Sequence, residues 1–199
     1  MEFRGSIASI LAVIATASGV GAATLDSAAS GIAAPTTTIT FNEVALSTGT
    51  SVTNQFASFG VTFTPGVTYF NTVSQRPNFS GAAAIDFFGA PVSIKFGQAV
   101  TDMSAAMTAN FGGATFTTFL NGVQVEEFTS TLDLTANNFY GFTGSLFDEV
   151  ALTPSGSTSV AIDNLSFTVA AVPVPASLPM LAAGLLGIGF MARRHQKKA

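Results

Sequence analysis

The chain has no cysteine and no tryptophan, and its single histidine, His195, stands close to the C-terminus. Without cysteine the protein cannot form disulfides or thiolate metal sites, so burial of apolar surface must stabilise it. Because no histidine precedes His195, the rest of the chain cannot supply Ser-His-Asp or Cys-His catalysis or a histidine-bearing zinc site. No glycine-rich phosphate loop joins a predicted strand to a helix. These absences favour a protein that is not an enzyme.

Charge is also scarce, at 9% of residues. Residues 36–170 contain two basic residues, Arg76 and Lys95, against nine acidic ones, which gives this segment a net charge of −7. An acidic exterior argues against nucleic acid and anionic membranes as partners, but it is compatible with divalent cations. Two carboxylates can cleave a glycosidic bond. Since nine acids form many pairs by chance, a small glycan-acting enzyme is only a third reading.

The N-terminal residues 1–23 have the pattern of a secretory signal peptide. Arg4 precedes a run of apolar and small residues from Ser6 to Val20, and cleavage is expected near Ala22 or Ala23. The alternative is an N-terminal anchor helix. Residues 24–35 are rich in Ala, Ser and Gly and predict a disordered lead-in. Residues 36–170 are long enough for one domain with its own core.

The pattern within residues 36–170 predicts β-structure. Asn121-Gly122 lies between two β-rich runs and predicts a type I′ hairpin turn, because both central residues need positive φ. One or two helical turns are expected over residues 52–59, stopped by Gly60. The fold class predicted is all-β, an antiparallel β-sandwich of the jelly-roll type. Its strands are expected at 37–44, 61–64, 67–71, 83–88, 92–96, 103–109, 115–120, 123–129, 138–142, 149–153 and 159–169.

Three carboxylates fall on the apolar phase of predicted strands: Glu43, Asp148 and Asp163. Along the last predicted strand, apolar residues occupy alternate positions, and this alternation shifts by one residue at Asp163-Asn164. Such a shift predicts a β-bulge. A carboxylate in a core position must be neutralised, paired or bound to metal. One hypothesis is that the three acids hold a structural Ca²⁺, which prefers oxygen ligands. The alternative is that they are solvated at strand ends or accept hydrogen bonds from turn amides.

Aromatic rings and amides suit sugar recognition, and a few such residues stand in predicted loops or strand edges. The alternative reading is that they belong to ordinary surface or core. The candidates for a sugar-facing site are Tyr69, Arg76, Asn78, Asn137 and Tyr140.

The C-terminal residues 172–199 form a distinct segment. A proline-rich motif at 172–179 is followed by an apolar stretch, predicted as a transmembrane helix at 178–192, and by a basic end at 193–198. Counted from Ala176, the apolar stretch of 17 residues spans ~25 Å as a helix, near the lower limit for crossing a bilayer. The basic end predicts a cytoplasmic C-terminus. An ordinary anchor is one reading, but a short span behind a rigid motif favours a segment that is cut.

This segment resembles the PEP-CTERM sorting signal. The family's usual Val-Pro-Glu-Pro has Glu where this chain has Val174, so the motif looks like the Val-Pro-Leu-Pro-Ala variant. The resemblance implies export through the Sec translocon, and processing by a membrane-embedded exosortase of a Gram-negative bacterium that makes exopolysaccharide. The residues that carry it are Val172, Pro173, Val174, Pro175, Ala176, Ser177, Leu178, Pro179, Arg193 and Arg194.

A second resemblance concerns the domain. Ile39–Glu43 and Ala161–Phe167, among other short motifs, resemble β-sandwich domains found ahead of this signal, which look like carbohydrate-binding modules in fold. In such modules a calcium commonly sits beside the terminal strands, so the resemblance also implies the calcium hypothesis.

The combined reading is a protein exported across the inner membrane and held there transiently by its tail. It then becomes a non-enzymatic component of the cell surface or biofilm matrix. The alternative is a carbohydrate-binding module that recognises the extracellular polysaccharide. The absence of tryptophan favours the first reading, because tight sugar stacking usually uses Trp or Tyr.

Overall fold

The computed structural model describes residues 22–71, 76–81, 84–156 and 158–171. The predicted signal peptide, apart from its last two residues, and the whole sorting segment lie outside the described residues. Among the residues that are described, no helix is long and apolar enough to cross a membrane. The chain divides after Val169 into two units, and all the strands belong to the first.

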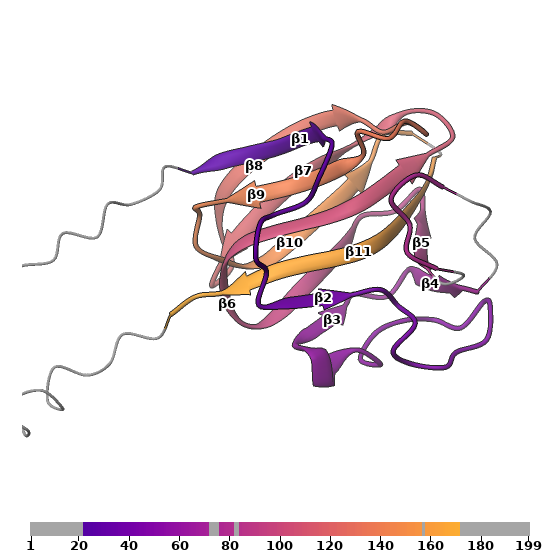
Figure 1. Cartoon of the computed structure of the whole chain (residues 1–199), viewed down its shortest axis with the longest axis horizontal. Helices are drawn as coiled ribbons and strands as arrows, with labels where there is room; N and C mark the ends of the chain where they lie inside the picture. The colour runs from indigo at the N-terminus through magenta and orange to yellow at the C-terminus, as the bar shows by residue number, and fades with distance from the viewer. Residues whose placement is uncertain (1–21, 72–75, 82–83, 157, 172–199) are drawn as a thin grey trace, which may run out of the picture. The chain divides into compact units, whose positions relative to one another are not determined.

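The described residues form eleven antiparallel strands joined in one sheet, so the prediction of an all-β antiparallel fold is confirmed (Figure 1). A single 3₁₀ turn, η1 (Ala57–Phe59), lies between the second and third strands. The strands are β1 (Ala23–Ala28), β2 (Thr37–Ile39), β3 (Val61–Phe63), β4 (Val67–Phe70), β5 (Ala84–Phe88), β6 (Val92–Ala109), β7 (Gly113–Leu120), β8 (Val123–Thr131), β9 (Phe139–Thr143), β10 (Phe147–Pro154) and β11 (Ser159–Val169).

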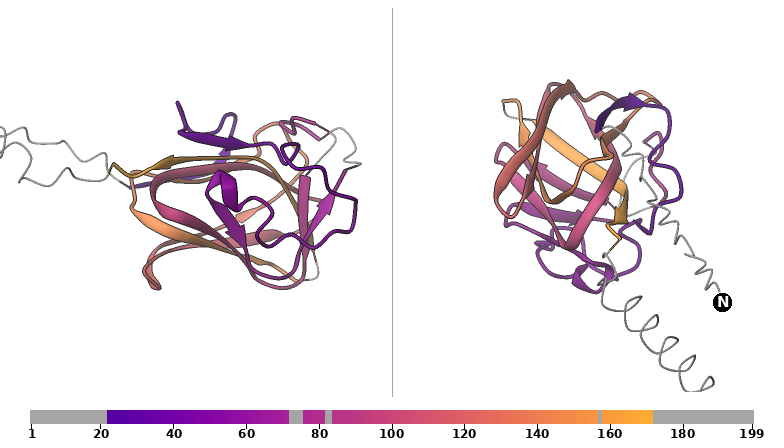
Figure 2. Two further views of the ribbon diagram at one scale, coloured as in Figure 1. Left: turned by 90° about the horizontal axis from the view of Figure 1, so that it is seen from below. Right: turned by 90° about the vertical axis from the view of Figure 1, so that its left-hand side faces the viewer.

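The long strand β6 organises the sheet. Its first part, Val92–Phe96, pairs with β3 and β10, whereas its last part, Met103–Ala109, pairs with β9 and β11. Beyond β10, the sheet extends through the paired strands β7 and β8. Beyond β11, it extends through the paired strands β5 and β4. The sheet thereby folds into two layers that share β6, and the side views in Figure 2 show strands on opposite sides of a common interior.

The two strands predicted at 92–96 and 103–109 are therefore one strand of 18 residues. The sequence between them has a glycine, Gly97, but no proline and no two-residue turn, so the backbone stays extended through it. The two segments are nevertheless distinct in their pairing, because the partners change at Val100.

Phenylalanine fills the interior between the layers. Phe116 stacks on Phe128 with ring centroids 4.6 Å apart, and Phe142 meets Phe147 edge-on at 6.0 Å. Each fully buried ring contributes roughly 1.5–3 kcal/mol through the apolar area that it removes from water. The core thus has the stabilisation that a chain without disulfides requires.

Two local predictions are confirmed. The pairing of β11 with β6 shifts register between Asp163 and Ser166, and Asn164 has φ 50°, which is the predicted bulge. Asn121 (φ 52°) and Gly122 (φ 79°) form the tight turn that joins β7 to β8. Both sites depend on positive φ, which Asn and Gly adopt more readily than other residues.

The structure differs from the prediction in three segments: the lead-in, the strand predicted at 37–44 and the helical turns predicted at 52–59. The lead-in predicted as disordered contains β1, which pairs with β9. Its side chains are exposed or half-buried, and its backbone groups pair with an otherwise open sheet edge. The strand predicted at 37–44 ends at Ile39, because Phe41 takes φ 58° and the chain turns. The helical turns predicted at 52–59 reduce to η1, which Gly60 ends in the left-handed conformation, as predicted.

Candidate functional site

The bulge in β11 carries Asp163 into the interior, where its side chain is fully buried. Its Oδ2 accepts hydrogen bonds from the amide (2.7 Å) and hydroxyl (3.2 Å) of Ser80, and its Oδ1 accepts one from the amide of Asn164 (2.7 Å). Burial raises the pKa of Asp163 to about 6, although these hydrogen bonds oppose the rise, and the negative charge of Glu43 adds to it.

A set of amide side chains extends the network around Asp163. The Nδ2 of Asn164 donates to the carbonyl of Asn78 (2.7 Å), and the Nδ2 of Asn78 donates to the Oδ1 of Asn138 (2.6 Å). Asn138, which is fully buried, donates in turn to the carbonyl of Pro77 (2.8 Å). The loop segment 76–80, between β4 and β5, is thereby fastened to β11 and to the residue preceding β9.

The structure does not bring the three predicted calcium ligands together. Glu43 lies near enough to influence Asp163, but its Oε1 accepts hydrogen bonds from the amide (2.7 Å) and hydroxyl (2.9 Å) of Thr40. Asp148 lies at the β7–β8 hairpin, where its Oδ2 accepts a hydrogen bond from the amide of Asn121 (2.9 Å). Within the described ranges no group of three or more His, Cys, Asp or Glu residues is placed to hold a metal.

Glu43 and Asp148 therefore match the alternative reading, in which acids accept hydrogen bonds from turn amides. Asp148 is wrong as a member of the calcium set, because the pattern of one strand could not reveal its distance from Asp163. Only the pair of Glu43 and Asp163 survives as a candidate for a cation, and a pair of carboxylates supplies fewer oxygens than the 6–8 that calcium takes.

Two of the predicted sugar-facing residues belong to the core. Tyr69 is 4% exposed and Tyr140 is fully buried. The ring of Tyr140 stacks on Phe116 at 5.7 Å, and its hydroxyl donates to the carbonyl of Thr131 (3.2 Å) and accepts from the hydroxyl of Ser27 (3.3 Å). Burial raises the pKa of Tyr140. Alternation along a strand does not distinguish the two faces when both layers bury aromatic rings, and so the prediction for both tyrosines is wrong.

None of the other three candidates lines the pocket that is described below. The guanidinium of Arg76 donates from Nη1 to the buried Thr108 hydroxyl (2.5 Å) and lies 5.9 Å from the ring centroid of Phe79. The side chain of Asn78 is engaged in the amide network, and Asn137 is exposed. Arg76 and Asn78 thus hold their own loop in place, although Asn78 is exposed, as Asn137 is, and Arg76 is half-buried.

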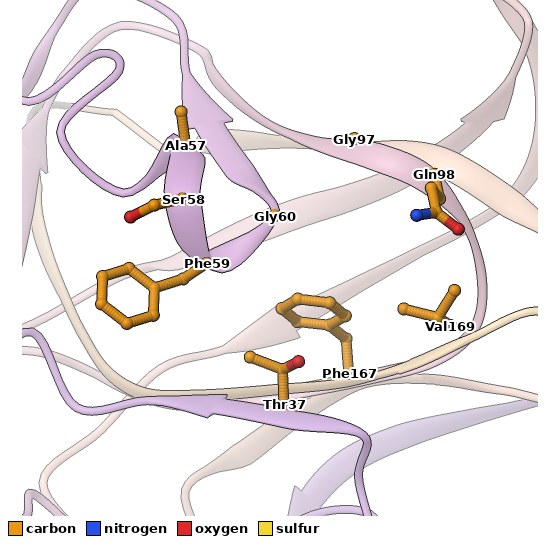
Figure 3. Close-up of a pocket in the computed structure, with 9 residues that line it drawn as sticks. All are labelled: Thr37, Ala57, Ser58, Phe59, Gly60, Gly97, Gln98, Phe167 and Val169. Atoms are coloured by element: carbon orange, nitrogen blue, oxygen red, sulfur yellow. The ribbon is translucent and has the colours of Figure 1, made fainter.

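A pocket that the sequence did not indicate lies where η1 approaches the C-terminal end of β11 (Figure 3). It has a volume of about 500 Å³, within the range typical of small-ligand sites. Gly60 has a φ of 89°, which suits glycine, whereas a Cβ there would make only an ordinary contact, 3.5 Å from the Cζ of Phe167. The lining residues are Thr37, Ala57, Ser58, Phe59, Gly60, Gly97, Gln98, Phe167 and Val169.

The chemistry of this pocket is neutral and mixed. Phe59 and Phe167 provide aromatic surface, and Ser58, Thr37 and Gln98 carry hydroxyl and amide groups, with no charged residue in the lining. Figure 3 shows the ring of Phe167 in the middle, above Thr37, with Phe59 on its left and Gln98 on its right. The only sequence signals were the glycines Gly60 and Gly97, which mark a close backbone approach without naming the side chains around it.

A search of protein-family models finds no family that matches this chain, and a search of curated proteins finds no similar sequence.

Proposed function

We propose that this protein is an exported, non-enzymatic component of the bacterial cell surface or biofilm matrix, sorted by its C-terminal segment. The observation that carries the proposal is the order of residues 172–198, in which a proline-rich motif precedes an apolar stretch and a basic end. The last strand, β11, ends at Val169, so the sorting segment follows the folded domain almost at once. Residues 1–23 serve as the signal peptide for the Sec translocon.

The domain in this proposal is a jelly-roll β-sandwich, and the described pairing supports it. β6 takes part in both layers, and the first and last strands of residues 36–170, β2 and β11, are neighbours at Leu165–Ile39. A rigid all-β domain with a core rich in phenylalanine withstands the extracellular space without disulfides. Its role in the polysaccharide layer is structural or adhesive.

Variants in the native host test the sorting proposal. Replacing Pro173 and Pro175 by alanine is expected to leave the full-length tail in the inner membrane, because the exosortase no longer recognises the motif. Lys95→Ala, an exposed change in the domain, is the matched control for expression and export. Equal amounts of motif variant and control at the cell surface and in the medium would contradict sorting by this motif.

The pocket favours a second function, recognition of the extracellular polysaccharide. A neutral recess with two aromatic rings and several hydroxyl and amide groups fits a neutral sugar ring, which has an apolar face and hydroxyls at its edge. Phe59→Ala should weaken binding to polysaccharide extracted from the host several-fold. Phe88→Ala removes a ring that is 64% exposed and lies outside the pocket, and it should bind like the wild type. If both variants bind equally well, the pocket is not the sugar site.

A further inference from the structure

The hairpin tip at Asn121-Gly122 combines features that make an asparagine chemically unstable. Both residues are exposed, and a Cβ built on Gly122 would meet no atom within 4 Å. In the described part of the chain the side chain of Asn121 makes no hydrogen bond, and the ladder at this end of the hairpin pairs Leu120 with Val123. The amide nitrogen of Gly122 is therefore free to react with the neighbouring side-chain amide.

No other asparagine of this chain has the same combination. The chain has nine asparagines, and Asn121 alone precedes a glycine. Asn78, Asn138 and Asn164 use their side chains in the amide network. Three more are exposed and have no side-chain hydrogen bond within the described ranges, but a residue with a side chain follows each of them: Asn54, Asn110 and Asn137.

We propose that Asn121 is a site of spontaneous deamidation in the mature protein. The nitrogen of Gly122 attacks Cγ of Asn121, so that an N–Cγ bond forms, the Cγ–Nδ2 bond breaks, and ammonia leaves with the proton of the glycine amide. The cyclic imide is then opened by water. Attack at Cγ gives aspartate, and attack at the main-chain carbonyl gives isoaspartate, in which the backbone runs through the former side chain.

Both products change the hairpin. Asp148 accepts a hydrogen bond from the amide of residue 121, so the new carboxylate arises beside an existing one. Isoaspartate also adds a backbone atom to a loop of two residues, and a loop of that length sets the register of β7 and β8. The reaction thus proceeds with the age of each molecule, and it loosens this end of the sheet.

Incubation of the full chain in detergent at mildly alkaline pH tests the proposal, with peptide mass spectrometry as the readout. The segment containing Asn121 should convert to the acid with loss of ammonia and appear as two isomers. Segments containing Asn54, Asn110 or Asn137 should convert about tenfold more slowly, because the following side chain crowds the attacking nitrogen. Asn121→Asp supplies the standard for the aspartate product, and it should elute as one of the two isomers.

Two outcomes would overturn the proposal. If Asn121 stays intact in the folded chain while the same chain in urea converts, the turn protects the side chain. If Asn137 converts as fast as Asn121, the glycine and the geometry of the tip are not responsible.

Discussion

We predict that the stability of the wild type depends on pH through the buried carboxyl of Asp163, and that Asp163→Asn removes this dependence. The carboxyl of Asp163 is fully buried, and its pKa rises from 3.8 to about 6 on folding. Between these values the folded protein binds more protons than the unfolded chain, so the unfolding free energy falls as the pH rises. The stabilisation is present below pH 4 and is lost once the pH has passed about 6.

The magnitude follows from the size of the shift. A shift from 3.8 to about 6 corresponds to about 3 kcal/mol, at 1.36 kcal/mol for each pKa unit. In Asp163→Asn the charge is absent at every pH. Because an amide nitrogen replaces one accepting oxygen, a hydrogen bond from Ser80 or Asn164 is lost, at a cost of about 1–3 kcal/mol. The variant should therefore be less stable than wild type near pH 4 and close to it near pH 7.

Urea unfolding of both chains at a series of pH values measures this difference. The free energy of unfolding of the variant minus that of the wild type should rise by about 3 kcal/mol from pH 3 to pH 7. Glu127→Gln, at an exposed position, controls for the loss of one negative charge. A difference that is the same at every pH would refute the reasoning.

The same titration tests the calcium hypothesis for Glu43 and Asp163. A bound cation favours the carboxylate form, so added Ca²⁺ would stabilise the wild type near pH 7 and reverse the fall in stability with pH. Asp163→Asn would not respond to it. If Ca²⁺ leaves the stability of both chains unchanged, the two carboxylates have no role in metal binding.

Three further changes test the packing. Gly141→Ala should cost about 3 kcal/mol of unfolding free energy in urea, because its Cβ would lie 1.9 Å from the carbonyl oxygen of Met103. Gly97→Ala is the matched control and should be near neutral, because the nearest contact of its Cβ would be at 3.7 Å. Tyr140→Phe should lower the thermal midpoint by the equivalent of about 1 kcal/mol, since the hydroxyl loses its contacts with Ser27 and Thr131; an unchanged midpoint would mean that these hydrogen bonds contribute nothing. Lys95→Ala should cost less than about 1 kcal/mol, because its ion pair with Glu149 is half exposed and 3.5 Å long; a larger loss would show that the pair matters more than its exposure indicates.

Local signals predicted the elements of the fold well. The hairpin at Asn121-Gly122 was predictable because Asn and Gly adopt positive φ more readily than other residues. The bulge at Asp163-Asn164 was predictable because the alternation of apolar residues shifts by one position there. β1 was missed because an edge strand without buried side chains has no alternating pattern to find. The continuity of β6 was missed, although the sequence has no turn signal at Gly97 and the backbone stays extended through it.

Long-range placement was predicted less well than local structure. Tyr69 and Tyr140 were candidates for a sugar-facing site, with core packing as the alternative, and partners far away in the sequence bury them. Asp148 and Asp163 share the same strand-phase signal, but each contacts a different turn. The pocket beside η1 depends on the approach of Phe59, Gln98 and Phe167, which lie on three separate segments, and no pattern within one segment indicates that approach.

The most direct test of the sorting proposal is the intact mass of the protein recovered from its native host, measured in the cell-bound fraction and in the medium. We predict a mass that lacks residues 1–22 or 1–23 and also lacks the residues after about Pro175, with or without an added anchor. A mass that still includes Arg193 to Ala199, found in the membrane fraction, would contradict processing and would make the tail an ordinary membrane anchor.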